Sequence, residues 1–126
     1  MIHGIGTDIV RIARIRHALE RHGERFAHRI LAASERDAWA ASADPARFLA
    51  KRFAAKEAFG KALGTGVAAP ATLHAVAVAH DAAGKPEFRY GEGLASYLGE
   101  RQLGAHLSLS DEDDYVIAFA VIDYRS

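Results

Sequence analysis

The chain contains 126 residues, of which half are hydrophobic and a quarter are charged; it has no cysteine, and its formal net charge is zero. This length and composition indicate one soluble globular domain. The lack of cysteine excludes disulfides, thiolate metal sites and cysteine nucleophiles, so we expect a reducing, cytoplasmic setting. The segment "MIHGIGTDIV" lacks the features of a signal peptide, and no apolar run is long enough to span a bilayer.

Alternating polar and apolar residues predict the strands, and apolar residues three or four apart predict the helices. In chain order we expect a strand from residue 2 to about 8, helices over 11–22, 35–42 and 46–63, strands over 73–80 and 87–90, a helix over 91–104, and strands over 106–110 and 115–123. Ser34 is the expected N-cap of the second helix. This order predicts an α+β fold, a single domain over 1–126 in which a small, antiparallel-rich sheet packs on helices.

The first strand carries two glycines on one face. Gly4 and Gly6 share that face with Asp8, because alternate residues of a strand point the same way. Glycine has no side chain, so another element can approach this face very closely. The helix over 46–63 is suited to do so, since it contains the small residues Ala54, Ala55, Ala58 and Gly60.

Glu57 and Lys61 are four residues apart and therefore lie on the same face of the predicted helix. An ordinary exposed ion pair is one interpretation. The other depends on packing: if the helix lies against the first strand, Asp8 and Glu57 converge. Two carboxylates without histidine or cysteine suit Mg²⁺, and Lys61 would then supply positive charge to a bound phosphate.

Two further segments have both a structural and a functional interpretation. The run from Gly64 to Gly66 is either a helix stop with its loop or a place where backbone amides approach a phosphate. His106 shares a strand face with Ser108 and Ser110. Histidines in such positions are usually structural, although this polar strip also suits an anionic ligand.

Charge is distributed unevenly along the chain. Residues 1–61 hold 12 of the 16 lysines and arginines but only 7 of the 16 acidic residues, a net charge of +5. Six arginines lie between residues 11 and 29. Such a stripe is either a solvated helix face or a surface for an acidic partner, which could be a nucleic acid, an anionic lipid or an acidic protein.

Three segments, "GIGTDIV", "RFAAKEAFGKALGTG" and "HLSLSDEDDYVIAFAVI", follow one another in this order along the chain. Together they closely resemble the holo-[acyl-carrier-protein] synthases, the small bacterial 4′-phosphopantetheinyl transferases. The resemblance runs from Ile2 to Ile122, and "GKP" at 84–86 also fits it. Its most specific part is the pairing of K-E-x-x-x-K and G-T-G with the earlier G-I-G-x-D-I.

The resemblance implies an enzyme that moves 4′-phosphopantetheine from coenzyme A to a serine of apo acyl carrier protein. It implies a requirement for Mg²⁺, release of adenosine 3′,5′-bisphosphate and a role in fatty acid biosynthesis. It also implies a homotrimer whose active sites lie at the junctions between protomers. We therefore expect neither a nucleic acid nor a membrane as partner.

The resemblance also assigns roles to individual residues. Asp8 and Glu57 match the metal-binding carboxylates, and Glu57 and Lys61 are the expected catalytic residues. The expected contacts with coenzyme A are Arg52, Lys56, Lys61, Gly64, Thr65, Gly66, Lys85, Pro86 and His106. By the same analogy, His106 and the turn at Lys85 and Pro86 come from the neighbouring protomer.

The arginine stripe acquires a purpose in this scheme, because acyl carrier proteins are strongly acidic. Arg14, Arg21 and Arg25 are the residues expected to dock and steer that partner. One departure from the family is Asp111, which follows Ser110 where many members have histidine or threonine-histidine. The role of this position is therefore open.

Two other functions compete with this one. A non-catalytic docking module would use the arginines to bind an acidic protein and would not need Asp8. A nucleic-acid-binding protein would use the same stripe, but its arginines are not interleaved with aromatic residues as a stacking platform requires. Neither alternative accounts for the carboxylates.

Overall fold

The computed structural model describes residues 1–125. Its elements, in chain order, are β1 (Ile2–Arg11), α1 (Ile12–His22), α2 (Glu24–Ile30), the 3-10 turn η1 (Ala33–Glu35), α3 (Arg36–Ala40), α4 (Pro45–Leu63), β2 (Val76–His80), β3 (Pro86–Tyr90), α5 (Glu92–Glu100), β4 (Leu103–Asp111) and β5 (Tyr115–Tyr124). The α+β class and the antiparallel pairing predicted from the sequence are confirmed.

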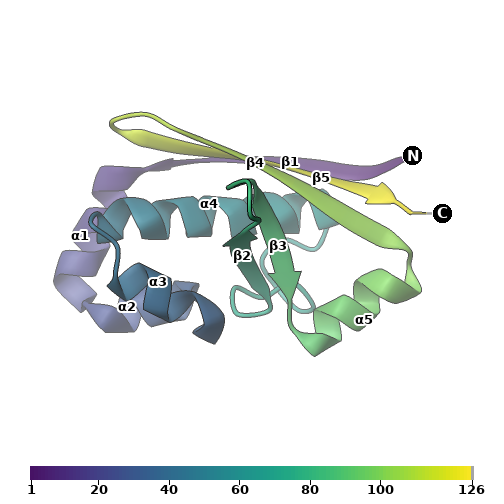
Figure 1. Cartoon of the computed structure of the whole chain (residues 1–126), viewed down its shortest axis with the longest axis horizontal. Helices are drawn as coiled ribbons and strands as arrows, with labels where there is room; N and C mark the ends of the chain where they lie inside the picture. Colours follow the sequence, from purple (N-terminus) through teal and green to yellow (C-terminus); the bar gives the residue numbers. More distant parts are fainter. Residues whose placement is uncertain (126) are drawn as a thin grey trace.

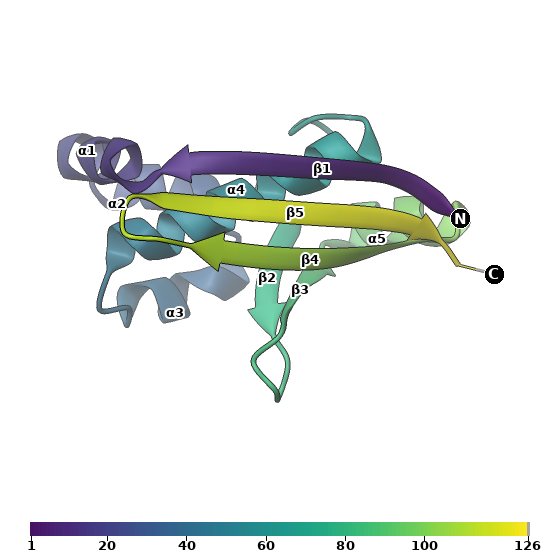
Figure 2. The same cartoon turned by 90° about the horizontal axis from the view of Figure 1, so that it is seen from above.

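The strands form two sheets rather than the single sheet that was expected. A three-stranded sheet has the order β1-β5-β4, and β2 and β3 form a separate two-stranded hairpin. Figure 1 shows α4 lying beneath the three-stranded sheet, and Figure 2 shows the hairpin projecting beyond the β4 edge of that sheet. The N- and C-terminal segments are therefore adjacent, because β1 pairs with β5 along almost its full length.

The close approach expected at the first strand is present. A Cβ atom added to Gly6 would overlap the carbonyl oxygen of Ala58 and would lie 2.8 Å from the backbone nitrogen of Ala62. A Cβ atom on Gly4 would likewise overlap the carbonyl oxygen of Ala62. The backbones of β1 and α4 thus touch directly, which no residue larger than glycine would permit at these two positions.

Helix α4 is enclosed on nearly every side, which explains its unusual composition. It packs against β1 and β5 above, α1 and α2 on one flank, and β2 on another. Twelve of its 19 residues are buried, and they include Arg52 and Lys56 as well as Leu49 and Phe59. Its N-terminus is capped by Asp44, whose carboxylate accepts a hydrogen bond from the Arg47 backbone at 3.2 Å.

Four local expectations were wrong. The helix expected over 91–104 ends at Glu100, and β4 already begins at Leu103. β1 continues to Arg11 instead of ending near Asp8, because it stays paired with β5 as far as Tyr115. The segment Glu24–Ile30 forms the unpredicted helix α2, which Gly23 separates from α1 by adopting a φ of 61°. Ser34 caps no helix; it lies inside η1, where the Glu35 carboxylate accepts a hydrogen bond from the Ala32 backbone.

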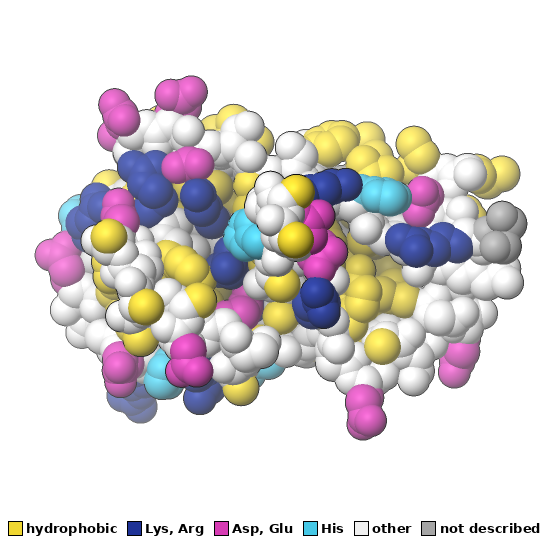
Figure 3. Space-filling model, in the orientation of Figure 1, with side chains coloured by type: hydrophobic (Ala, Val, Ile, Leu, Met, Phe, Trp, Pro, Cys, Tyr) yellow, Lys and Arg dark blue, Asp and Glu magenta, His cyan; other side chains and the backbone are white. Residues whose placement is uncertain are grey.

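The outer face of the three-stranded sheet is apolar and exposed. Ile5 and Ile9 of β1 and Ile117 and Phe119 of β5 are each at least 40% exposed. In Figure 3, hydrophobic side chains gather along the upper right of the molecule, where Figure 1 places this sheet. Such an apolar face is unusual for a surface in contact with water alone. Within residues 1–125, no helix has the length and apolar character that a bilayer crossing requires.

Replacement of Gly6 by alanine is expected to destabilise the fold by about 3 kcal/mol, because the added methyl group forces β1 and α4 apart. Thermal or urea unfolding measures the change. Gly93, in α5, is the matched control, since a Cβ atom there meets nothing within 4 Å. Gly93→Ala should leave the protein as stable as the wild type or stabilise it slightly. Equal stability of the Gly6→Ala and Gly93→Ala variants would contradict the close-packing interpretation.

Candidate functional site

Strand β1 and helix α4 bring Asp8 and Lys61 together. The Lys61 ammonium lies 3.3 Å from the Asp8 carboxylate and donates a 2.8 Å hydrogen bond to the carbonyl oxygen of Thr7. The Asp8 side chain is 18% exposed and that of Lys61 is 52% exposed. The sequence-based expectation that α4 packs on β1 at these residues is therefore confirmed, and the ammonium is still open to the surface.

Glu57 lies one turn before Lys61 on the same face of α4. Its pKa is raised above the ordinary value, first because the carboxyl group is partly buried and second because the Asp8 carboxylate repels its charge; Lys61 opposes the shift. The two carboxylates are therefore close enough to interact. A cation placed between them would relieve this repulsion, and that is the condition under which a hard divalent cation binds well.

The donor set fits Mg²⁺ better than a transition metal. Asp8 and Glu57 offer only oxygen atoms, and the part of the chain that the structure describes holds no cluster of three or more histidine, cysteine, aspartate or glutamate residues. Mg²⁺ binds through one or two carboxylates and completes its shell with water and substrate phosphates. Asp8 and Glu57 are thus the residues that could offer carboxylate oxygens to such an ion.

The loop from Gly64 to Gly66 is a helix stop. Gly64 adopts a φ of 93°, and the backbone amides of Gly64 and Gly66 both donate 3.0 Å hydrogen bonds to the carbonyl oxygen of Gly60. The Thr65 hydroxyl donates to the carbonyl oxygen of Gly66. Both glycine amides thus have a partner within the chain, and the expected contact of Gly64, Thr65 and Gly66 with coenzyme A stays a prediction.

Lys56 and Arg52 lie on the interior side of α4, not at a surface. The Lys56 ammonium is fully buried and donates to three oxygens, including Glu35 Oε1 at 2.6 Å. Arg52 Nε is 3.2 Å from the other oxygen of Glu35, and its guanidinium lies over the Phe48 ring. Burial lowers the pKa of Lys56, and the Glu35 charge opposes that shift. The expectation that Lys56 and Arg52 contact coenzyme A is therefore corrected.

The remaining predicted contacts lie away from the carboxylates within one chain. His106 points from the outer face of β4 and is 3.1 Å from Asp123, whereas Asp8 points inward from β1 at the other edge of the sheet. Lys85 and Pro86 are at the exposed turn of the β2–β3 hairpin, which projects on the β4 side in Figure 2. A single copy of the chain does not bring these three residues to the carboxylate pair.

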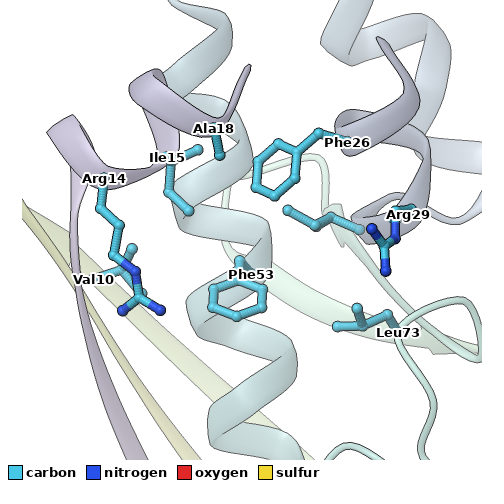
Figure 4. Close-up of a pocket in the computed structure, with 9 residues that line it drawn as sticks. Val10, Arg14, Ile15, Ala18, Phe26, Arg29, Phe53 and Leu73 are labelled. Carbon is cyan, nitrogen blue, oxygen red and sulfur yellow. The ribbon is translucent and has the colours of Figure 1, made fainter. Parts of the chain in front are cut away.

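An apolar groove of about 390 Å³ lies beside the carboxylate site. Figure 4 shows Arg14 and Arg29 on opposite sides of it, with Phe53 of α4 between them. The other lining residues are Val10, Ile15, Ala18, Phe26, Ile30 and Leu73. Phe53 is one turn before Glu57. The groove was not predicted from the sequence, because part of its lining comes from α2, which the sequence pattern did not indicate.

Two of the three arginines proposed for partner binding lie at or next to this groove. Arg14 lines the groove, and Arg25 lines an adjacent hollow with Phe26 and Arg29. Arg14, Arg21 and Arg25 are all exposed. Two positive charges at opposite sides of an apolar floor form a surface suited to an acidic, partly apolar ligand.

Asp111, which departs from the family pattern, has a structural contact in this chain. Its carboxylate accepts a 2.7 Å hydrogen bond from Arg47 and is 3.4 Å from the Lys51 ammonium. Arg47 also donates to the carbonyl oxygen of Glu112 at 2.7 Å. The acidic turn between β4 and β5 is thereby attached to the first turns of α4.

In metal-free protein, Asp8→Asn should lower the pKa of Glu57, since it removes one of the two causes that raise it. Lys61→Met should raise that pKa further, because the opposing positive charge is lost. NMR titration of the side-chain carboxyl carbons measures both. Asp37→Asn, in α3, is the control and should leave Glu57 unchanged; the same pKa in all four proteins would show that the three groups do not interact.

A known protein family and its members match the chain over nearly its whole length. The profile of the 4′-phosphopantetheinyl transferase superfamily matches residues 4–120. The holo-[acyl-carrier-protein] synthase of Azoarcus sp. strain BH72 is 80% identical over 125 residues, which cover 99% of this chain and 100% of that protein.

Solved structures agree with these matches. The crystal structure of the holo-[acyl-carrier-protein] synthase from Neisseria meningitidis is 47% identical, with a TM-score of 0.94 over 98% of this chain and 99% of that one. The synthase from Bacillus anthracis, solved in complex with CoA (3′,5′-ADP), is 32% identical, with a TM-score of 0.83 over 99% of each chain. The chain therefore belongs to the 4′-phosphopantetheinyl transferase superfamily and is an enzyme of its holo-[acyl-carrier-protein] synthase family.

Proposed function

We propose that the protein transfers 4′-phosphopantetheine from coenzyme A to a serine of apo acyl carrier protein, depends on Mg²⁺ and releases adenosine 3′,5′-bisphosphate. The observation that carries this proposal is the convergence of Asp8, Glu57 and Lys61 at the contact of β1 and α4. The names of the relatives and the coenzyme A complex of the Bacillus anthracis enzyme support it. This transfer would activate the carrier protein for fatty acid biosynthesis.

Asp8 and Glu57 are the residues that would hold Mg²⁺, which when bound neutralises charge developing on the pyrophosphate oxygens. Lys61 is adjacent to this pair and half exposed, so its ammonium is available to a phosphate oxygen and stabilises the departing bisphosphate.

In the transfer, a bond forms between the serine oxygen and the β-phosphorus of coenzyme A. The bond from that phosphorus to the oxygen of the adenosine bisphosphate breaks. The serine proton passes to Glu57 or to water.

The groove between α1 and α2 is proposed as the docking surface for the carrier protein. Its apolar floor and its two flanking arginines complement an acidic protein that presents apolar side chains. Val10 and Phe53 line this groove, and each is close in its own element to a proposed metal ligand: Val10 is two residues after Asp8, and Phe53 is four residues before Glu57. A protein seated in the groove would present its serine next to the carboxylates.

We further propose a homotrimer in which neighbouring protomers complete each active site. Its support is twofold. The outer face of the three-stranded sheet is apolar and exposed. His106 and Lys85 are separated from Asp8 within one chain, so only another copy could bring them to the same substrate. Light scattering on the active protein measures the assembly, and an active monomer would refute the trimer.

Incubation of apo acyl carrier protein with coenzyme A, Mg²⁺ and this protein should add one phosphopantetheine mass to the carrier, as measured by intact mass spectrometry. EDTA, Asp8→Ala and Glu57→Ala should each reduce the initial rate on the order of 10²-fold or more, because each removes charge stabilisation from the transition state. Asp37→Ala, outside the site, is the control and should retain full activity.

Other outcomes of this assay separate the competing functions. Transfer that survives loss of both carboxylates would retain the reaction and refute the metal assignment. Tight binding of carrier protein without any transfer would favour the non-catalytic docking module. Preferential binding of nucleic acid over carrier protein would favour a nucleic-acid-binding protein.

Replacing Arg14 by glutamate should raise the KM for carrier protein roughly tenfold and leave the KM for coenzyme A unchanged, since charge at a docking surface acts mainly on association. The rise should shrink as salt increases, because exposed charges are screened. Arg89→Glu is the control, because Arg89 is exposed on β3 outside the groove. An equal rise in that variant would mean that net charge, not this surface, determines carrier binding.

A further inference from the structure

Lys56 immediately precedes the proposed metal ligand Glu57, yet its side chain points into the protein. Its ammonium donates hydrogen bonds to the carbonyl oxygen of Ile30 at 2.7 Å and to that of Leu73 at 2.9 Å, besides its ion pair with Glu35. An ammonium has three protons, so all of its donors are used. Nothing in the proposed reaction accounts for a lysine in this position.

Glu35 completes a closed network around this lysine. Besides the two cations, its carboxylate accepts 2.9 Å hydrogen bonds from the backbone amides of Ala32 and Val78. The network thus joins α4, the turn after α2 and strand β2 through two side chains that are almost fully buried. Buried pairs of this kind are weak evidence for extra stability, but removal of one partner is strongly destabilising, so the contacts that they make between segments are costly to break.

The two backbone acceptors of Lys56 belong to residues that line the docking groove. Ile30 is the last residue of α2, and Leu73 lies in the loop that leads to β2. Figure 4 shows Leu73 and Arg29 on one side of the groove and Arg14 on the other. Phe53, on the same helix as Lys56, lies between the two sides. One ammonium therefore attaches two groove-lining segments to the helix that also carries Glu57.

We propose that Lys56 is a positioning residue for carrier-protein recognition: by holding the carbonyl groups of Ile30 and Leu73 against α4, it sets the shape of the groove next to the metal site. This inference rests on the proposed function, because it concerns the partner of that reaction. Lys56 does not touch the substrates; it acts through Ile30 and Leu73. Loss of the lysine should therefore impair carrier binding and leave the coenzyme A step intact.

The test is the steady-state kinetics of Lys56→Met with each substrate varied in turn at saturation of the other. We expect the KM for carrier protein to rise on the order of tenfold, while kcat and the KM for coenzyme A change less than about twofold. Leu98→Ala, in the core beneath α5, is the control for general destabilisation, because Leu98 is buried outside the groove and the network. It should change neither KM.

A purely structural role predicts a different pattern. In that case, Lys56→Met and Leu98→Ala would lower the active fraction, and with it kcat, while both KM values stay unchanged. That pattern, or an equal rise in both KM values of Lys56→Met, would overturn the proposal. The wild-type protein in the same assay distinguishes failure of the proposed function from failure of the positioning role. No transfer by the wild type would refute the proposed function. Transfer by the wild type, together with an unchanged carrier KM in the variant, would refute only the positioning role.

Removing the lysine leaves Glu35 paired with Arg52, but the carbonyl groups of Ile30 and Leu73 lose their buried donor, and Lys56→Met is therefore at risk of not folding. Lys56→Gln also leaves the pair of Glu35 and Arg52 in place, and its amide group keeps a donor for one of the two carbonyl groups. It should fold and show a selective rise in the KM for carrier protein, because the other carbonyl group is still released. A folded Lys56→Gln variant with the wild-type carrier KM would overturn the proposal.

Discussion

The direct backbone contact between β1 and α4 is the constraint on which the rest of the structure depends. At Gly4 and Gly6 the strand lies so close to the helix that a methyl group would overlap a helix carbonyl oxygen. This closeness allows a lysine on the helix to reach both a side chain and a carbonyl oxygen of the strand. A larger residue at either glycine would widen the gap and separate Asp8 from Lys61. The chemistry of the site is thus built on two residues that have no side chain.

Helix α4 serves two different surroundings through adjacent residues. Successive residues of a helix point about 100° apart, so Glu57 turns toward Asp8 while Lys56 turns toward Glu35 and the interior. Glu57 is half-buried and its pKa is raised. The Lys56 ammonium is fully buried, and each of its three protons is donated to an oxygen atom. An arrangement of this kind couples the position of the carboxylate site to that of the neighbouring groove, since both are attached to the same rigid helix.

The two faces of the three-stranded sheet have equally distinct roles. The inner face carries Asp8 and packs on α4, whereas the outer face combines exposed apolar residues with His106. A strand places alternate residues on opposite faces, so one short sheet can contribute a carboxylate to one site and a histidine to another surface. The proposed trimer gives both faces a purpose, because the exposed face of one protomer would adjoin the site of the next.

Much of the site could be predicted from the sequence, because it depends on local periodicity. Alternation placed Gly4, Gly6 and Asp8 on one strand face, and a spacing of four placed Glu57 with Lys61. The burial of Lys56, the occupied amides of Gly64 and Gly66, and the groove behind α2 could not be predicted in this way. Each depends on a partner chosen by the fold; Lys56 meets a glutamate 21 residues earlier in the chain and a carbonyl group 17 residues later. Local patterns determine which way a side chain points along its own helix or strand, but only the packing of distant segments decides what it meets there.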